Sequence, residues 1–400
     1  MSSRDGRAVP PDETLARVLR FRARMGLTRV ANITGLDTLG IPVWTACRPN
    51  SRSLSVSQGK GVDHRSARIS AVMESVEAYH AERVDQPLRL ASYAEIADRL
   101  LVADVVGLPR TRKLFHPDLP LLWIEAREIA SGAGVWVPFE LVHLNYTKPV
   151  LPGAGLFLAT SNGLASGNTK AEALSHALSE VIERDASALW TLAGGVRSVE
   201  TRVDPVTIDH PVVVELLERC ERARVAVAIW DMTSDVGIPC FTCVVGDRET
   251  SSGRRYSTAR GMGCHPDAGV ALLRALTEAA QSRLTVISGS RDDLAPSRYQ
   301  VAEDQGDAGY LRAILCEGRV TRDFRATRSV GGGSADDDVQ AQAAALRAVG
   351  LDQILVVDLT MAEFGIPVVR AVVPGLEGPE YAPGYLPGKR ALKRLEGAAK

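Results

Sequence analysis

The chain has 400 residues, 45% of them hydrophobic and 24% charged, and its formal net charge is −1; this composition is ordinary for a globular protein, and the length predicts one large domain or two interlocked ones. A net charge near zero argues against bulk electrostatic attraction to nucleic acid or to an anionic membrane. No apolar run approaches the roughly 20 residues of a membrane span, and the polar residues 1–11 do not resemble a secretory signal, so we expect a cytoplasmic protein without a nucleic-acid or membrane partner.

Several helices are predicted by their start and stop signals. Pro10 and Pro11 indicate a helix start, and that helix should continue to about residue 25. Ser92 is expected to cap a short helix over residues 93–101, and another helix follows Pro211 and ends by residue 224. The glycine loop at residues 330–338 leads into a helix that reaches Leu346. The tail that follows residue 382 is rich in Pro and Gly and then basic.

Three Gly-Ile-Pro turns, at residues 40–42, 237–239 and 365–367, each lead into an apolar strand. Two of these turns are followed by a strand, a glycine pair and a helix. Residues 122–138 have a similar strand–turn–strand order ahead of a further helix. This order predicts related β-hairpin-plus-helix units, with mostly antiparallel sheets and helices on their faces, which is an α+β architecture. The alternative is that Gly-Ile-Pro is a common turn and that the matches are coincidental.

One helical spacing occurs three times: Ala, three residues, Ala, two residues, Glu, two residues, then Glu or Gln. The copies are Ala67-Ala71-Glu74-Glu77, Ala173-Ala177-Glu180-Glu183 and Ala271-Ala275-Glu278-Gln281. Steps of three and four stay on one helix face, so each copy aligns small alanines with carboxyl or amide oxygens. Three such helices could place carboxylates around one point, where clustered oxygens favour Mg²⁺ or Ca²⁺.

The second of these helices carries the strongest signal, because Glu172, Glu180 and Glu183 share one narrow arc opposite an apolar face. The alternative is a solvent-exposed face, on which Glu180 and Arg184 form an ordinary surface pair. Few lysines alternate with these glutamates, and the first helix repeats the Glu-x-x-Glu spacing. Both features favour a carboxylate site.

A glycine-rich run at residues 160–168 precedes the second helix, and free backbone N–H groups at a helix N-terminus suit phosphate. Lys60, in a Gly-Lys-Gly sequence before the first helix, is a plausible charge for the same phosphates. No P-loop motif is present. In the third helix, Arg283 could neutralise a transferring phosphate or be a structural arginine. For His265, which precedes this helix, we expect a structural role.

Six cysteines occur, and only Cys240 and Cys243 form a C-x-x-C pair. A zinc site would require a second pair or histidines at ligand spacing. Because the pair lies in an apolar run that reads as a strand, its two thiols should point to opposite faces. We expect buried, reduced thiols here.

Together these motifs resemble the YcaO family: Gly-Lys-Gly with the first Glu-x-x-Glu, the run from Ser161 to Asn168 with Glu172, Glu180 to Asp185, and the third helix through Arg283. The resemblance implies a YcaO-type fold around a central ATP site, with Mg²⁺ held by glutamates. It divides the chain into a polar segment and helix (1–29), an ATP-binding catalytic domain (30–382) and a basic tail (383–400).

Carried over by position, the resemblance implies three groups of site residues. The implied catalytic residues are Glu183, Arg184 and Arg283. The implied nucleotide-binding residues are Lys60, Ser70, Glu74, Glu77, Ser166, Asn168, Glu172, Glu180 and Gln281. The implied metal ligands are Glu74, Glu77, Glu172, Glu180 and Glu183. Ser166 enters because Ala165 stands where family members often have Ser.

YcaO enzymes activate a backbone amide of a ribosomal peptide with ATP. The product then depends on the attacking group: external sulfide gives a thioamide, and a Cys, Ser or Thr side chain gives an azoline. Azoline-forming members commonly end in alternating prolines, which residues 383–400 lack, and residues 29–35 and 48–54 are similar to the group paired with TfuA proteins. The resemblance therefore implies thioamide formation with a TfuA-like partner, in a homodimer. Azoline formation and a non-catalytic ATP- and peptide-binding scaffold are the alternatives.

Overall fold

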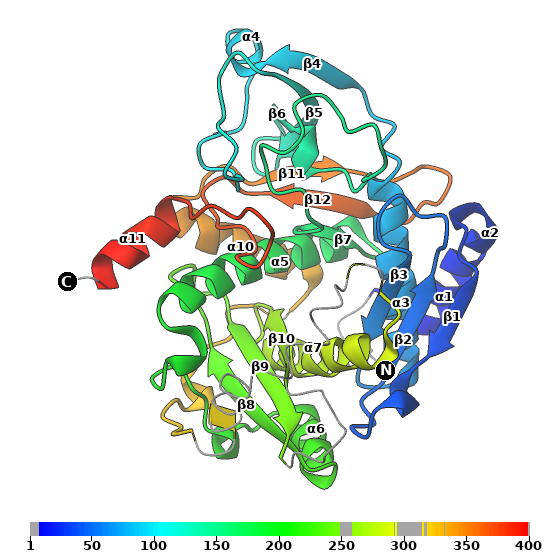
Figure 1. Cartoon of the computed structure of the whole chain (residues 1–400), viewed down its shortest axis with the longest axis vertical. Helices are drawn as coiled ribbons and strands as arrows, with labels where there is room; N and C mark the ends of the chain where they lie inside the picture. The colour runs from blue at the N-terminus through cyan, green and yellow to red at the C-terminus, as the bar shows by residue number, and fades with distance from the viewer. Residues whose placement is uncertain are drawn as a thin grey trace.

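Three helices each lie against an antiparallel sheet, and these units form the middle and lower parts of the molecule (Figure 1); two of the sheets have three strands and the third has six. The computed structural model describes residues 8–248, 258–291, 293, 314–315, 318–331 and 333–398. The first unit comprises β1 (Arg29–Asn32), β2 (Val43–Cys47), β3 (Val56–Lys60) and α3 (His64–Ala81). Another comprises β8 (Val225–Asp231), β9 (Cys240–Asp247), β10 (Thr258–Cys264) and α7 (Ala268–Ser288).

The unit that carries the second carboxylate helix is assembled from distant parts of the chain. Helix α5 (Lys170–Leu192) packs on β7 (Leu164–Ser166) and β12 (Val368–Val372), and β12 in turn pairs with β11 (Leu355–Asp358). The expectation that the strands at residues 122–138 form the β-hairpin of the unit with this helix is therefore wrong. The C-terminal hairpin, which enters through the third Gly-Ile-Pro turn, takes that place.

Each Gly-Ile-Pro turn precedes a strand that is paired on both sides, namely β2 between β1 and β3, β9 between β8 and β10, or β12 between β11 and β7. The three glycines, Gly40, Gly237 and Gly365, have φ values of 65°, 77° and 59°. This left-handed conformation is accessible to glycine at little cost and strained for other residues. The recurrence of the motif thus reflects the same turn at the same place in three sheets, which confirms the predicted repeated unit.

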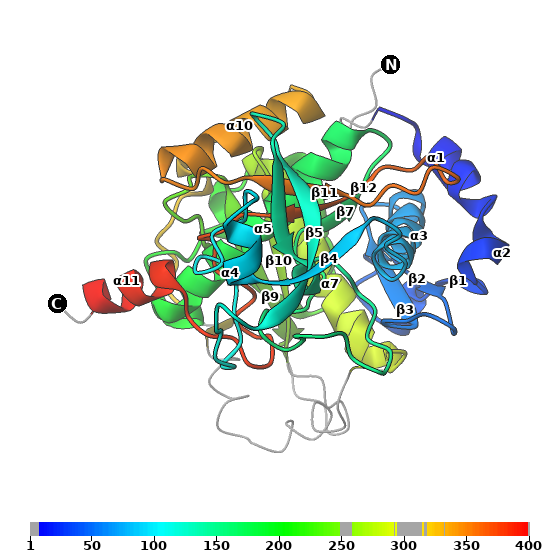
Figure 2. The ribbon, with the colours of Figure 1, turned by 90° about the horizontal axis from the view of Figure 1, so that it is seen from above.

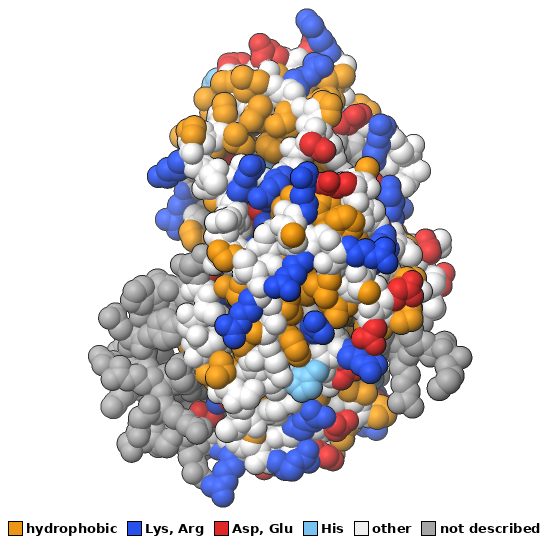
Figure 3. Space-filling model, turned by 90° about the vertical axis from the view of Figure 1, so that its right-hand side faces the viewer, with side chains coloured by type: hydrophobic (Ala, Val, Ile, Leu, Met, Phe, Trp, Pro, Cys, Tyr) orange, Lys and Arg blue, Asp and Glu red, His pale blue; other side chains and the backbone are white. Residues whose placement is uncertain are grey.

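A further hairpin extends the third sheet into the upper part of Figure 1. Strand β5 (Pro120–Glu128) pairs with β11 and also with β4 (Leu88–Ser92) and β6 (Gly134–Pro138). Helix α4 (Tyr93–Ala97) follows β4 and is shorter than expected, although Ser92 and Glu95 form the capping box that starts it. Figure 3 shows apolar side chains gathered on this part, where Leu88, Leu90 and Leu114 are exposed.

The remaining helices cover the flanks. Seen from above, α1 and α2 lie outside α3, and α10 lies on the opposite edge (Figure 2). The bounds are α1 (Pro11–Leu19), α2 (Arg22–Met25), α6 (Pro211–Arg222), α10 (Ala335–Ala348) and α11 (Lys389–Ala398), with short 3-10 turns at Thr34–Leu36, Phe139–Leu141, Gly195–Arg197, Pro205–Thr207 and Phe324–Ala326. Helix α11 shows that part of the predicted tail is ordered. Among the described helices, none is both long and apolar enough to cross a bilayer.

The two cysteines of the C-x-x-C pair lie on opposite faces of β9, as predicted. Cys240 belongs to the core under α5, and Cys243 belongs to the core under α7. Both thiols are free and fully buried, and burial raises the pKa of each. They are therefore reduced core residues; Cys316 lies outside the described residues.

Candidate active site

Glycines on the strands set how closely the three helices approach the sheets. A Cβ on Gly59 would lie 1.9 Å from the backbone nitrogen of Ala71 in α3, and one on Gly261 would lie 2.1 Å from that of Ala279 in α7. Gly167, before α5, meets the backbone of Ala173 in the same way, at 2.6 Å. The recurring glycines and alanines are thus matched surfaces of helix–sheet packing. This packing accounts for the glycine pairs that precede the first and third helices, Gly59 with Gly61 and Gly261 with Gly263.

With their alanines turned toward the sheets, the three helices bring five carboxyl groups together: Glu74, Glu77, Glu180, Glu183 and Glu278. Burial raises the pKa of Glu74 to about 7; Arg291 and Lys60 oppose this rise, and the charge of Glu278 adds to it. Burial, together with the charges of Glu74 and Glu180, raises the pKa of Glu77 to about 8. Since each carboxyl is influenced by partners on another helix, the side chains converge rather than spread over a solvent face.

Glu183 is the most enclosed of the glutamates on α5, with 7% of its surface exposed. Burial raises its pKa to about 7, and the charges of Glu278 and Glu180 act in the same direction. The pKa of Glu180 is also raised by burial, despite the nearby guanidinium of Arg184. An exposed helix face would leave these carboxyls near their ordinary values, so the alternative of a solubilising face is not supported by the geometry.

Two cations lie within this group of acids. Arg184 lies 3.2 Å from a carboxylate oxygen of Glu183 and 3.8 Å from one of Glu180. Lys60 pairs with Glu278, whose other oxygen accepts the backbone N–H of Met262 at 3.2 Å. Burial raises the pKa of Glu278, but Lys60 and Arg184 outweigh burial and hold it below the ordinary value. Five carboxyl groups share these two close cations, so the site retains an excess of acid.

This donor set suits a hard divalent cation. Carboxylate oxygens are the ligands that Mg²⁺ prefers, and a bound cation would offset both the burial and the mutual repulsion that raise the pKa values. In the described part of the chain, no three acidic, histidine or cysteine side chains are close enough to hold one ion alone. A magnesium ion here would therefore take the rest of its coordination from phosphate oxygens and water, as it commonly does.

Ser166 closes one side of the cluster. Its backbone N–H and its hydroxyl donate to Glu77 Oε1 at 2.9 and 2.7 Å. Ser166 therefore contacts the cluster through Glu77, and its predicted contact with a nucleotide stays a prediction. Ser70 lies one turn before Glu74 on α3, on the same face.

Glu172 and Asn168 form a separate group at the start of α5. Glu172 accepts the backbone N–H groups of Asn168 at 2.7 Å and of Ala8 at 2.6 Å. Thr14 of α1 donates its hydroxyl to Asn168 Oδ1 at 2.7 Å. Because α5 rises about 1.5 Å per residue, Glu172 lies about 12 Å along the axis from Glu180. The structure therefore does not bring Glu172 into the five-carboxylate cluster.

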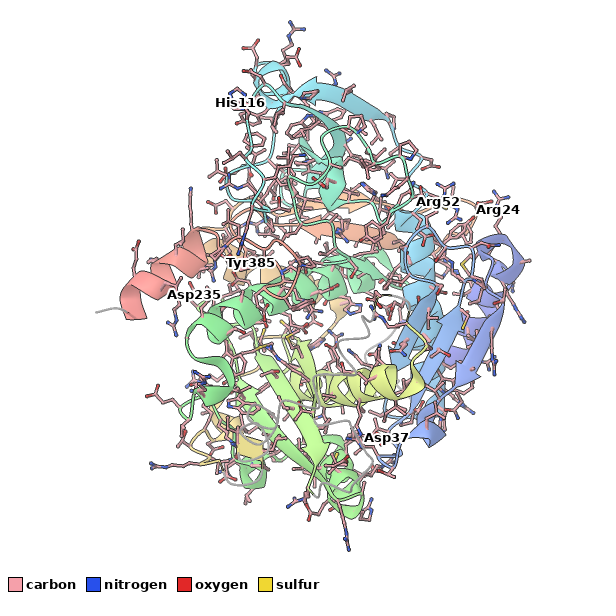
Figure 4. The ribbon with its side chains drawn as sticks, viewed as in Figure 1. Arg24, Asp37, Arg52, His116, Asp235 and Tyr385 are labelled. Carbon is pink, nitrogen blue, oxygen red and sulfur yellow. The ribbon has the colours of Figure 1, made fainter. Side chains whose placement is uncertain are left out.

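Gln281 and Arg283 differ in where they lie. Gln281 donates to the backbone oxygen of Gln58 at 2.9 Å, and the backbone of Gln58 in turn lies beside Glu74. Arg283 instead forms buried ion pairs with Asp37 at 2.8 Å and Asp247 at 2.9 Å. Figure 4 shows Asp37 beside α7 on the lower side of the molecule. Arg283 is thus neutralised away from the cluster, and we leave it out of the proposed site.

The C-terminal segment is fixed beside the cluster. Arg390 of α11 donates from Nε and Nη2, both at 2.9 Å, to the fully buried carboxylate of Asp185, which follows Arg184. Tyr385 donates to Glu377 at 2.8 Å, and Figure 4 shows Tyr385 and Asp235 near α11. The ring of Tyr381 lies 5.8 Å from the Arg184 guanidinium.

Four residues of this neighbourhood were not assigned to the site from the sequence: Glu278, Thr14, Arg291 and Tyr381. Glu278 carried a signal, because it stands in the repeated spacing. Arg291 is close enough to lower the pKa of Glu74, but no motif marks it. Thr14 and Tyr381 come from opposite ends of the chain, and their proximity to α5 depends on tertiary packing alone.

Comparisons with known proteins concern the family and the fold. The model of the YcaO cyclodehydratase family, described as ATP- and Mg²⁺-binding, matches residues 58–377. An uncharacterised protein in the tfuA 3′ region of Rhizobium leguminosarum bv. trifolii is 39% identical over 396 residues, covering 98% of this chain and 93% of that protein.

Two solved structures share the fold. The YcaO protein of Methanopyrus kandleri, bound with AMPPCP and Mg²⁺, has a TM-score of 0.72 and 24% identity, and 96% of each chain is covered. A heterocyclase in complex with substrate and cofactor has a TM-score of 0.76 and 23% identity, with 94% of this chain and 53% of that one covered. The chain thus spans about half the length of that heterocyclase.

Proposed function

The chain belongs to the YcaO family, and we propose that it uses ATP to activate a backbone amide of a ribosomal peptide, which an external sulfur donor then converts into a thioamide. The observation that carries the proposal is the convergence of carboxylates from three helices around Lys60 and Arg184. Such a site suits the triphosphate of a nucleotide with its magnesium.

Each group in the cluster has a role in this proposal. Glu74, Glu77, Glu180 and Glu183 would hold Mg²⁺, which offsets charge on the phosphates when bound. Arg184 and Lys60 would contact phosphate oxygens, because both already lie among the acids as charged donors. Glu183 and Arg184 are the proposed catalytic residues, since they form the closest buried pair on α5. Ser166 and Gln281 would hold Glu77 and the β3 edge in place.

The proposed reaction has two steps, phosphorylation of the amide oxygen and its replacement by sulfur. The amide oxygen attacks the γ-phosphorus of ATP, the bond to the bridging oxygen breaks, and ADP leaves. Hydrosulfide then adds to the amide carbon, the phosphorylated oxygen departs as inorganic phosphate, and loss of the sulfur proton leaves a carbon–sulfur double bond. An amide oxygen is a poor leaving group, and phosphorylation makes it a good one, so ATP supplies the driving force.

The choice of sulfur over ring closure is supported by the tfuA neighbourhood of the Rhizobium relative, which suggests a TfuA-like partner for this chain as well. The second candidate is azoline formation, favoured by the cyclodehydratase description of the family and by the heterocyclase fold match. In that reaction a Cys, Ser or Thr side chain of the substrate attacks the activated carbon, and no external donor is required. The homodimer stays a prediction, and light scattering would test it by measuring the molar mass in solution.

Mass spectrometry separates the candidates. Peptides encoded beside the gene are incubated with the protein, Mg²⁺, ATP, sulfide and a TfuA-like protein. We expect one oxygen of the peptide to be replaced by sulfur and ADP to be released. Loss of water would establish the azoline reaction, and binding of ATP without any ADP release would leave only a scaffold. A Glu183→Gln variant provides the inactive control.

A further inference from the structure

Strand β10 is at the end of its sheet, because the strand order is β10-β9-β8, and its pairing with β9 fixes which backbone groups face outward. His265 donates its N–H to the backbone oxygen of Pro239 at 3.1 Å, so these two residues are a hydrogen-bonded pair. Along an antiparallel register, hydrogen-bonded and non-hydrogen-bonded pairs alternate. It follows that Thr258, Arg260 and Met262 direct their backbone N–H and C=O groups away from β9.

One of these outward groups shows what the edge of β10 faces. The N–H of Met262 donates to Glu278 Oε1, in the carboxylate cluster, at 3.2 Å. The sulfur of Met262 also lies 3.8 Å from Arg184 Nη1. In Figure 1, β10 lies below α5 and beside α7, the helices that carry Arg184 and Glu278. The outer edge of β10 therefore runs directly up to the proposed active site.

Two residues before Met262, the same edge is open. Within the part of the chain that the structure describes, the outward N–H and C=O groups of Arg260 and Thr258 make no hydrogen bond. Both residues are half-exposed, whereas residues 261–264 are buried. A free strand edge is a template for another extended chain, whose backbone supplies the matching donors and acceptors. The edge thus offers a peptide up to four hydrogen bonds, from two N–H and two C=O groups.

The side chain of Arg260 fixes this edge relative to α5. Its Nε donates to Thr242 Oγ1 at 2.9 Å, and its Nη2 donates to Ser187 Oγ at 3.0 Å. Its guanidinium also lies 5.3 Å from the centre of the Trp190 ring. Ser187 and Trp190 belong to α5, the helix that carries Arg184. Because the edge is already held in place, little ordering of the protein opposes the addition of a strand here.

We propose that Thr258 and Arg260 pair through their backbone with an extended segment of the peptide substrate, next to the amide that is modified. Met262 is closed by Glu278, so the pairing stops there and the substrate continues into the carboxylate cluster. Since a strand advances about 3.3 Å per residue, the substrate amide two residues beyond the position opposite Arg260 would lie about 7 Å further along, level with Met262. The inference rests on the proposed function, because it assigns a place to the substrate of that reaction.

Recognition of this kind depends on the substrate backbone and not on its side chains. Any extended peptide carries the required N–H and C=O groups, but proline and N-methylated residues lack the N–H. We therefore expect the protein to tolerate different side chains next to the modified amide. We also expect it to reject peptides in which the amide nitrogens of that segment are blocked.

Saturation-transfer NMR tests the proposal on the full-length protein without ATP, so the result does not depend on turnover. The first probe is acetyl-Thr-Val-Thr-Val-Thr amide, the second is acetyl-Ser-Leu-Ser-Leu-Ser amide, and the third is the first peptide with N-methyl groups on its three central residues. We expect saturable binding of the first two probes, with affinities within about threefold of each other. The N-methylated probe should bind at least about tenfold more weakly, the effect of losing two hydrogen bonds.

A pair of substitutions locates the binding on β10. Thr258→Pro removes one outward N–H and leaves the hydrogen bonds to β9 intact, so the first probe should bind about threefold to tenfold more weakly. Thr258→Val keeps that N–H and is the matched control, for which we expect unchanged affinity. If Thr258→Pro does not fold, a diazirine analogue of leucine in the second probe takes its place, and its photo-crosslinks should fall on residues 258–262.

The proposal is overturned if neither unmodified probe binds, if the N-methylated probe binds equally well, if Thr258→Pro binds like the wild type, or if the crosslinks fall elsewhere. Binding as expected, but without ATP-dependent modification of any peptide, would count against the proposed function and not against the edge of β10. Modification of a peptide, with probe binding that N-methylation does not weaken, would overturn the pairing at this edge and leave the proposed function standing.

Discussion

Replacing Glu77 with glutamine should stabilise the protein at alkaline pH while weakening magnesium-nucleotide binding. Glu77 lies among like charges, and its pKa is raised from 4.5 to about 8 by burial and then by Glu74 and Glu180. Ionising it in the folded protein is therefore unfavourable. Glutamine has nearly the same shape, and its Oε1 can still accept the two hydrogen bonds from Ser166.

The direction of the stability change with pH follows from the linkage between proton binding and folding. Because the folded-state pKa is above the unfolded value, the folded state binds the extra proton between about pH 4.5 and pH 8, and the stability this provides is lost as the pH rises through about 8. One pKa unit is about 1.4 kcal/mol, so the rise to about 8 sets a ceiling of about 5 kcal/mol. Glu77 is only half-buried and partly screened by water, so we expect about 2 kcal/mol.

Thermal unfolding without magnesium or nucleotide, at pH 6 and pH 9, measures this effect. For 400 residues, 2 kcal/mol corresponds to a rise of about 2 °C in the melting temperature of Glu77→Gln at pH 9; at pH 6, which lies less than halfway between the two pKa values, the rise should be about 1 °C. Glu218→Gln, on the exposed face of α6, is the matched control and should change stability by less than about 0.5 kcal/mol. A variant that melts at or below the wild-type temperature at pH 9 would refute the argument that Glu77 is repelled in the folded state.

Three further substitutions probe the supports of the site. Lys60→Met removes the near cation of Glu278, so the pKa of Glu278 should rise and urea denaturation at pH 8 should show a loss of about 1–3 kcal/mol; an unchanged midpoint would contradict the pairing. Arg390→Met leaves the carboxylate of Asp185 buried without its cation, which should cost about 3–5 kcal/mol in the same assay, whereas a loss below about 1 kcal/mol would mean that water replaces the arginine. Gly261→Ala drives a Cβ into the α7 backbone, so circular dichroism should show a loss of more than about 3 kcal/mol or no folded protein; a wild-type melting curve would show that α7 can move away.

The repeated spacings predicted the local units but not their assembly. The Gly-Ile-Pro motifs predicted turns that lead into strands, and the structure confirms these turns. Under α5, however, β7 is paired with a hairpin from residues 355–372, well over 100 positions away. Pairing between strands so far apart is decided by tertiary packing, which the order of elements along the chain does not encode.

For the site, helical periodicity predicted correctly which side chains lie on the same face of a helix, but it did not account for how far apart they lie along the helix axis. Glu172 shares the arc of Glu180 and Glu183, but it lies about two turns away along α5 and binds Asn168 instead. On α7, a step of five residues from Glu278 places Arg283 about 140° around the helix. The same periodicity could thus have separated Arg283 from the carboxylates before the structure showed its pairs with Asp37 and Asp247.

Calorimetric titration with Mg²⁺ and the non-hydrolysable analogue AMPPCP tests the central claim most directly, by comparing the wild type with Glu183→Gln and the control Glu218→Gln. We predict magnesium-dependent binding to the wild type and the control, accompanied by proton release near pH 7 as the cluster ionises. Glu183→Gln should bind at least about tenfold more weakly, which is about 1.4 kcal/mol. Equal affinity for the wild type and Glu183→Gln would show that the converging acids are not the magnesium-nucleotide site.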